Sequence, residues 1–163
     1  MTPDQFISSI VAAAQASMRL YNVPASFTIA QGADESGWGS SALCTQGCNI
    51  FGVKADPSWR GDTVDMLTRE YLNGQWVQVV AHWRKYPDWL SCINDHAQFF
   101  IQNPRYAPAF TTVGGEAFAR AIAEAGYATD PAYADKLISI MRAHNLAQYD
   151  VTDPDGGTAP VNF

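Results

Sequence analysis

Two glutamates occupy positions where a carboxyl group could do chemistry. Glu35 lies in the last turn of a helical pattern that starts near Pro24 and ends on Gly37. The C-terminal end of a helix carries partial negative charge, which disfavours a nearby anion and raises the pKa of a carboxyl group. A carboxylic acid that keeps its proton near neutral pH can act as a general acid. We therefore predict that Glu35 is a catalytic acid.

Glu70 belongs to the clearest hairpin signal in the chain. Two β-prone runs flank Asn73-Gly74, a dipeptide that predicts a two-residue type I′ turn. In that register Glu70 lies opposite Val77 and is the one charge on the more apolar face. A buried acid is costly unless it is paired or has a function. Because glycoside hydrolysis usually needs two carboxyl groups, the pair predicts a sugar-cleaving enzyme. The alternative is that both glutamates are ordinary solvated surface residues.

The elements that position these acids are mostly helical. Apolar residues recur at helical spacing, and capping residues, Gly and Pro mark the helix ends. We expect a mostly α (α+β) fold with one catalytic domain over residues 1–149 and a flexible tail over 150–163. The signals predict helices over residues 3–20, 24–37, 90–101, 115–125 and 131–145, strands over 68–72 and 75–81, and loop with room for a short helical turn over 40–63.

Composition narrows the classes of partner. The 163 residues carry a formal net charge of −6, which argues against nucleic acid and anionic membranes as partners. No apolar stretch approaches the roughly 20 residues that a membrane span needs. Five Trp and seven Tyr suit carbohydrate, because sugar rings stack on aromatic faces. The first residues lack the basic and apolar regions of a secretory signal, so we expect synthesis in the cytoplasm without a signal peptide.

Three cysteines leave two interpretations open. Cys44 and Cys48 lie close together in a loop-like stretch and are expected to form a disulfide, which would fit an oxidising compartment. The alternative is a zinc site, because Cys44-x3-Cys48 and Cys92-x3-His96 together offer four ligands. We favour the disulfide or plain thiols, since four-ligand patterns this loose arise by chance. No metal or other cofactor is therefore expected.

Several motifs, in a fixed order over roughly residues 4–147, resemble the bacterial glucosaminidases of glycoside hydrolase family 73. These enzymes hydrolyse peptidoglycan in autolysins, flagellar rod proteins and phage lysins. Motifs in a fixed order are more specific than any one alone. The matching stretches are Ala33–Gly39, Asn49–Ala55, Trp59–Gly61, Thr68–Tyr71 with Asn73-Gly74, Asp95–Ala97, Asn103–Tyr106 and Ala125–Pro131.

The resemblance implies a lysozyme-like helical domain with a small β-hairpin lobe. It implies cleavage of the β-1,4 bond after N-acetylglucosamine in peptidoglycan, with Glu35 as general acid. Glu70 matches the second carboxylate, which the family carries on a mobile β-lobe. Either this carboxylate acts as the base, or the substrate's own acetamido group assists the reaction. Tyr127 matches a site tyrosine. The candidate substrate-binding residues are Trp38, Asn49, Phe51, Lys54, Trp59, Tyr71 and Tyr133. Core packing is the alternative for Trp38, Phe51 and Trp59, and holding the loop is the alternative for Asn49 and Lys54.

Asp34 departs from the resemblance. The family signature has Leu at this position, and the apolar stripe of the helix also predicts an apolar residue. Neighbouring residues on a helix point about 100° apart, so Asp34 need not touch the bond that reacts. If it lies close to Glu35, it would raise the pKa of that acid further.

For the cellular role, we expect an injected antibacterial effector, for example of a type VI secretion system. It would act on peptidoglycan in the periplasm of a target cell, and its partner would be a cognate immunity protein. The acidic balance favours this role over a phage endolysin. An endolysin or a wall-remodelling enzyme of the same activity is the alternative, and a non-catalytic peptidoglycan-binding module is an alternative of a different class.

Overall fold

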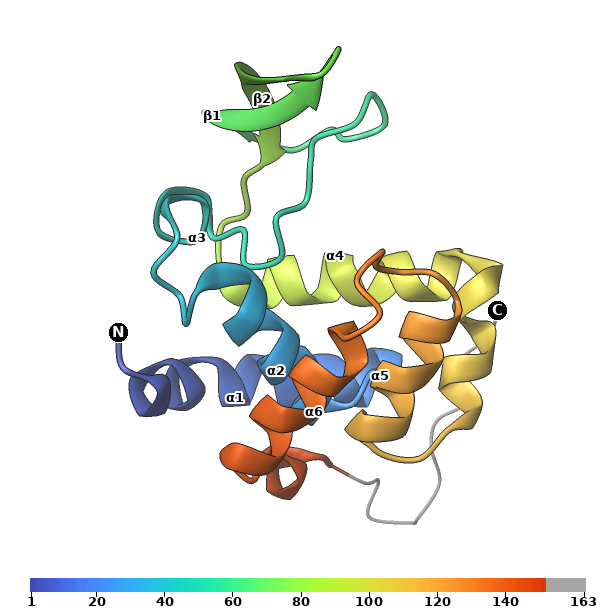
Figure 1. Ribbon diagram of the computed structural model, residues 1–163. Coiled ribbons are helices and arrows are strands. Elements are labelled where there is room, and N and C mark those ends of the chain that lie inside the picture. The colour runs from blue at the N-terminus through green and yellow to red at the C-terminus, as the bar shows by residue number, and fades with distance from the viewer. Residues whose placement is uncertain (152–163) are drawn as a thin grey trace.

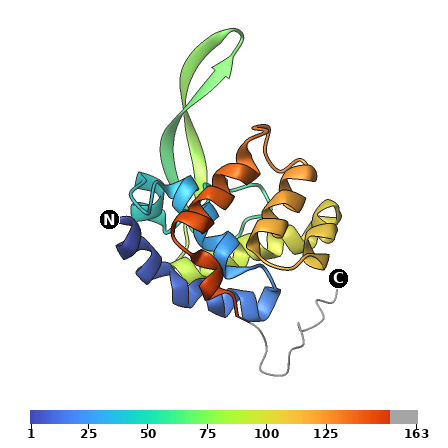
Figure 2. The ribbon, with the colours of Figure 1, turned by 60° about the horizontal axis from the view of Figure 1, so that its bottom comes forward.

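The computed structural model describes residues 1–151 as a helical body from which one β-hairpin projects (Figures 1 and 2). This architecture confirms the predicted α+β fold class. In chain order the elements are α1 (Pro3–Tyr21), α2 (Ala25–Ser36), α3 (Ala42–Gly47), β1 (Thr63–Leu72), β2 (Gln75–Arg84), α4 (Trp89–Gln102), the 3₁₀ helix η1 (Pro104–Thr111), α5 (Gly115–Glu124), α6 (Tyr133–Ala143) and the 3₁₀ helix η2 (Leu146–Tyr149).

Helix α2 lies at the centre of the body and carries Glu35. It contacts α1, α5, α6 and η2, and every residue from Ala25 to Ala33 is buried. Its small residues permit this close packing: a side chain at Gly32 would meet Ile50 Cγ2 at 3.1 Å. The helix ends where Gly37 adopts a left-handed conformation (φ 56°), which glycine tolerates without a steric cost. Glu35 is thereby fixed at the end of a helix held by packing along its length.

Helix α1 forms for reasons that are visible in its sequence. The Thr2 hydroxyl accepts from the Gln5 backbone N–H, and the Gln5 side chain accepts from the Thr2 backbone N–H, which completes a capping box. Its buried face carries Phe6 and Ile10, which join the core. The predicted range of 3–20 differs from the observed helix by one residue.

The hairpin has the predicted register and turn. Asn73 and Gly74 both have positive φ (51° and 79°), as a type I′ turn requires. The strands are longer than predicted, because alternation of partly buried and exposed residues continues back to Thr63 and on to Arg84. The three predicted pairs nearest the turn are Leu72–Gln75, Tyr71–Trp76 and Glu70–Val77, and all three are observed.

Three segments differ from the expectation. The Asp130 carboxylate accepts from the Ala132 backbone N–H, so α6 begins at Tyr133 rather than at residue 131. The chain after Asn103 forms η1, a 3₁₀ helix that the sequence pattern did not predict. Asp150, assigned to the flexible tail, accepts from both the backbone N–H (2.7 Å) and the hydroxyl (2.8 Å) of Ser26. The rest of the predicted tail, residues 152–163, lies outside the described residues.

Candidate active site

Glu35 is the next-to-last residue of α2 and is partly open to solvent. Partial burial of its carboxyl group raises its pKa above the ordinary value, and the negative charge of Asp34 raises it further. The positive charge of Lys136 acts in the opposite direction and is the smaller influence. The direction agrees with the sequence argument, although burial rather than the helix end is the main cause. A raised pKa lets a carboxyl group keep its proton to higher pH, as a general acid requires.

Behind Glu35 lies a buried hydrogen-bonded chain that joins three helices. His96 Nε2 on α4 donates to Gln31 Oε1 (2.8 Å), because an amide oxygen can only accept. Gln31 Nε2 in turn donates to Tyr133 Oη on α6 (2.8 Å). Burial lowers the pKa of His96 to about 3, so its ring is neutral. Since Tyr133 accepts from Gln31, its own hydroxyl proton is free to point elsewhere.

Tyr127 and Tyr133 bring two phenols close to the acid. Their ring centroids are 5.6 Å apart. Burial raises the pKa of both phenols, and the charge of Glu35 adds to the effect on each of them. Both groups therefore stay protonated at neutral pH and can donate hydrogen bonds. The predicted catalytic residue Tyr127 thus lies beside Glu35, as does the predicted binding residue Tyr133.

Glu70 lies in a different environment. It is close to the tip of the hairpin, and its side chain is 37% exposed. Lys54 Nζ lies 3.4 Å from Glu70 Oε1 and 5.7 Å from the centre of the Trp83 ring. The hairpin stands away from the helical body (Figures 1 and 2). The charged partner of Glu70 is thus Lys54, which precedes β1 in the chain. The charges that act on Glu35 come instead from α2 and α6.

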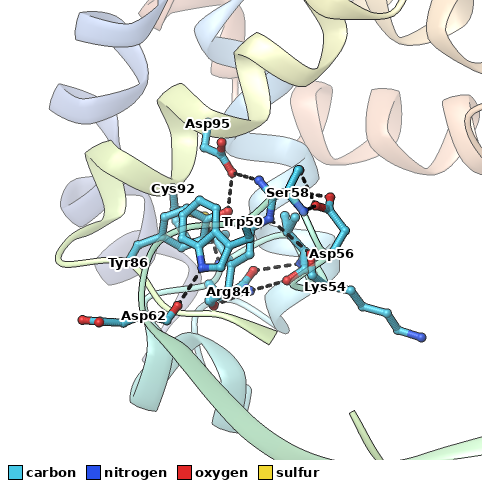
Figure 3. Close-up of polar contacts among 12 residues, drawn as sticks. Lys54, Asp56, Ser58, Trp59, Asp62, Arg84, Tyr86, Cys92 and Asp95 are labelled. Carbon is cyan, nitrogen blue, oxygen red and sulfur yellow. Dashed lines mark hydrogen bonds and ion pairs between the residues drawn. The ribbon is translucent and has the colours of Figure 1, made fainter. Parts of the chain in front are cut away.

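The base of the hairpin is anchored by Arg84. Its guanidinium donates to Asp95 Oδ2 on α4 (2.8 Å) and to Asp56 Oδ2 (2.9 Å), and it lies 4.6 Å from the centre of the Trp59 ring. The hydroxyl of Tyr86 donates to the same Asp95 oxygen (2.6 Å). Figure 3 shows Arg84 held between these groups. The lower end of the hairpin is therefore fixed to α4.

Three predicted substrate-binding residues are engaged in packing. Asn49 is 1% exposed, and its side-chain amide is fully used by Val53 and Arg84. It therefore holds the loop, which is one of its two predicted roles. Phe51 is buried and stacks on His96 with ring centroids 4.2 Å apart, and Trp38 packs edge-on against Phe6. Phe51 and Trp38 thus make the contacts of the core-packing alternative.

The remaining predicted binding residues are more open. Trp59 is partly buried, and its indole N–H donates to Asp62 O. Together with Tyr86 and Asp95 it lines a cavity of about 420 Å³. Tyr71 is 61% exposed on the outer face of the hairpin. Substrate contact by Trp59, Tyr71 and Lys54 stays a prediction.

The predicted Cys44–Cys48 disulfide is absent, because all three cysteines are free thiols. The backbone N–H of Cys48 donates to Cys44 O, as in a helical turn. At this spacing Cβ atoms lie about 5–6 Å apart, whereas a disulfide needs about 3.5–4.5 Å. Burial raises the pKa of Cys44 to about 11 and that of Cys92 to about 12. The zinc alternative also fails: among residues 1–151, no three Cys, His, Asp or Glu side chains gather to hold a metal ion.

Two residues of the site escaped sequence reasoning. Gln31 shares a helical stripe with Glu35, one turn earlier, which was a usable signal. Lys136 lies on α6, and its Nζ is 3.3 Å from Asp34 Oδ2. No local pattern links Asp34 on α2 with Lys136 on α6, so nothing in the sequence pointed to Lys136.

Comparison with known proteins decides the family. The glucosaminidase model, described as mannosyl-glycoprotein endo-beta-N-acetylglucosaminidase, matches residues 11–146. This chain belongs to the glucosaminidase family. The glycoside hydrolase domain of FlgJ from Salmonella typhimurium, in a C-terminally truncated form, has a similar structure (TM-score 0.78, 36% identity, covering 88% of this chain and 98% of that one). The domain is thus a glycoside hydrolase with a glucosaminidase fold.

Two curated glucosaminidase relatives are longer than this chain. The peptidoglycan hydrolase FlgJ of Escherichia coli K12 is 37% identical over 141 residues, which are 84% of this chain and 45% of FlgJ. The exo-glucosaminidase LytG of Bacillus subtilis is 36% identical over 162 residues, which are 96% of this chain and 57% of LytG. The chain thus spans about half the length of these relatives. Along residues 1–151, no helix is long and apolar enough to cross a membrane.

Proposed function

We propose that this glucosaminidase hydrolyses the β-1,4 bond between N-acetylglucosamine and N-acetylmuramic acid in peptidoglycan. The observation that carries the proposal is Glu35, a carboxyl group with a raised pKa beside two protonated phenols at a helix end. The names of the relatives, peptidoglycan hydrolase and exo-glucosaminidase, support the substrate class. Glu35 donates its proton to the oxygen of the leaving sugar as the glycosidic bond breaks.

Glu70 is proposed as the second carboxylate. It serves as the base that activates water, or it supports the positive charge that develops on the sugar while the substrate's acetamido group assists. Its ion pair with Lys54 orients the hairpin carboxylate. Tyr127 and Tyr133, which lie beside Glu35, donate hydrogen bonds to the sugar that reacts.

The test is digestion of purified peptidoglycan followed by mass spectrometry of the new reducing ends. We expect N-acetylglucosamine at those ends, and product release at least about 100-fold slower from the Glu35→Gln variant. New N-acetylmuramic acid ends would refute the proposed bond, and an active Glu35→Gln variant would refute the proposed acid. Proton NMR of the first-formed anomer separates retention from inversion.

For the cellular role, we propose an antibacterial effector that acts in the periplasm of a target cell and is neutralised by an immunity protein. The net charge of −6 supports this over an endolysin, because lone endolysins of Gram-negative phages tend to be basic. Expression with and without a periplasmic signal peptide tests the role: we expect lysis only with the signal, and protection by a co-encoded neighbour. A holin gene beside this gene would favour the endolysin instead.

A further inference from the structure

A charge pair borders the catalytic acid. Asp34 precedes Glu35 on α2, and its Oδ2 lies 3.3 Å from Lys136 Nζ on α6. The Asp34 side chain is 22% exposed and the Lys136 side chain is 49% exposed, so both are only partly screened by water. Asp34 occupies a position of α2 where the helical stripe predicts an apolar residue. In the structure its carboxylate is paired with a cation from α6.

The two charges act on Glu35 in opposite directions. The negative charge of Asp34 favours the protonated form of Glu35, and the positive charge of Lys136 favours the ionised form. Lys136 Nζ also lies 5.9 Å from the centre of the Tyr133 ring, so the pair borders the phenols as well as the acid.

The other groups that surround Glu35 carry no charge at neutral pH. Tyr127, on the loop after α5, and Tyr133, on α6, have raised pKa values and are protonated. His96, on α4 behind Gln31, is neutral because burial lowers its pKa. Beyond burial, Asp34 and Lys136 are therefore the charged side chains that act on the acid.

We propose that the Asp34–Lys136 ion pair is a positioning pair that sets the pH range over which Glu35 can donate its proton. Neither residue needs to touch the substrate. The inference rests on the proposed role of Glu35 as the general acid. It assigns a function to the one residue of the signature stretch that departs from the family pattern.

The test uses Asp34→Asn, Lys136→Met and the double variant, with initial rates on soluble glycan fragments across pH. The alkaline limb of the profile reports ionisation of the acid. In Lys136→Met we expect it to move to higher pH, because Glu35 keeps Asp34 beside it and loses the cation. In Asp34→Asn we expect it to move to lower pH. On that limb each single variant should change the rate by roughly threefold, in opposite directions, and the double variant should lie between them.

Arg142→Met is the matched control, because Arg142 is also on α6 but pairs with Glu116 on α5 (2.7 Å). Its profile should match that of the wild type. The proposal is overturned if both single variants move the limb in the same direction, if neither moves it, or if the control moves it as far.

A direct titration of Glu35 by NMR with carbon-13 labelled glutamate separates this inference from the proposed function. We expect the same two opposite shifts in the titration of Glu35 itself, whether or not the variants are active. If Glu35→Gln remains active while those shifts occur, the general-acid role fails and the electrostatic coupling stands. If the shifts are absent in an enzyme that needs Glu35, the coupling fails alone.

Discussion

Glu35 and Glu70 are held by two regions of different construction. Glu35 stands on a buried helix, and the chain from His96 through Gln31 to Tyr133 braces the site from behind. Glu70 stands on a two-stranded hairpin that is fixed at its base by Arg84, and its carboxylate pairs with Lys54. The helical body thus offers a preorganised acid, which is costly to disturb. The hairpin offers a carboxylate that can adjust to the substrate.

The two regions also differ in the number of large apolar side chains that they bury. Leu67, Tyr71, Trp76 and Val80 share the outer face of the hairpin, and each is about 60% exposed or more. Arg69 covers part of Trp76, with its guanidinium 5.2 Å from the ring centre. In the body, by contrast, large apolar side chains such as Phe27 and Phe100 are buried against each other. The hairpin therefore contributes little to the shared core.

The largest expected effect is on the acid. Glu35→Gln should lower hydrolysis by about 10²–10⁴-fold, the usual contribution of a general acid, measured as reducing ends released from peptidoglycan. Glu124→Gln, an exposed glutamate on α5, is the matched control and should keep full activity. Residual activity within tenfold of the wild type would show that another group supplies the proton.

The same variant should show what a preorganised acid costs in stability. The pKa of Glu35 is higher in the folded than in the unfolded protein, so the folded state binds more protons between the two pKa values. The stability of the wild type therefore falls as pH rises through that range and stays lower above it. Glu35→Gln lacks this penalty, so its Tm should equal or exceed that of the wild type at neutral pH. The difference should shrink below the ordinary pKa of glutamate; an unchanged gap in acid would contradict the explanation.

Next in size is the effect of Glu70→Gln on activity. Because an adjustable carboxylate is only partly positioned in advance, we expect a loss of the order of 10²-fold, at the lower end of the range for acid–base groups. Lys54→Met should lower the rate by less, since it removes only the partner. A loss at Glu70 as large as that at Glu35 would mean that the hairpin is as preorganised as the body.

Gln31→Leu tests the buried chain behind the acid. It leaves His96 and Tyr133 without their shared partner, at a cost of about 1–3 kcal/mol for each buried polar group left unpaired. Urea unfolding measures the loss. The matched control is Gln78→Leu, the same change on the exposed face of the hairpin, which should stay within about 0.5 kcal/mol of the wild type. Equal losses in the two variants would remove the contrast between the regions.

The smallest effect is expected for Trp76→Ser on the outer face of the hairpin. It removes one cross-strand ring pair with Tyr71, so the free energy of unfolding should fall by less than about 1 kcal/mol. Trp38→Ser, the same change in the helical body, should cost about 3 kcal/mol or more, because Trp38 packs against Phe6 and His144. A hairpin substitution as costly as the one in the body would show that the outer face is packed in solution.

The sequence by itself determined the features that depend on neighbouring residues. Caps, turns and apolar periodicity act within a few residues, so the α1 capping box, the end of α2 at Gly37 and the register around Asn73-Gly74 were all predictable. Glu35 was found because its place at a helix end can be read locally. The start of α6 was missed by two residues because a side-chain bond from Asp130 competes with the helix there.

Only the tertiary structure decided the partners. Gln31 meets His96 across 65 residues of sequence and Tyr133 across 102, and Asp34 finds Lys136 on a different helix. Helix packing fixes these contacts, and no local pattern encodes it. The same packing gave Asn49 and Phe51 structural roles and left Cys44 and Cys48 unpaired. Local sequence placed the acid, and the packing of α2 against α6 supplied the cation that acts on it.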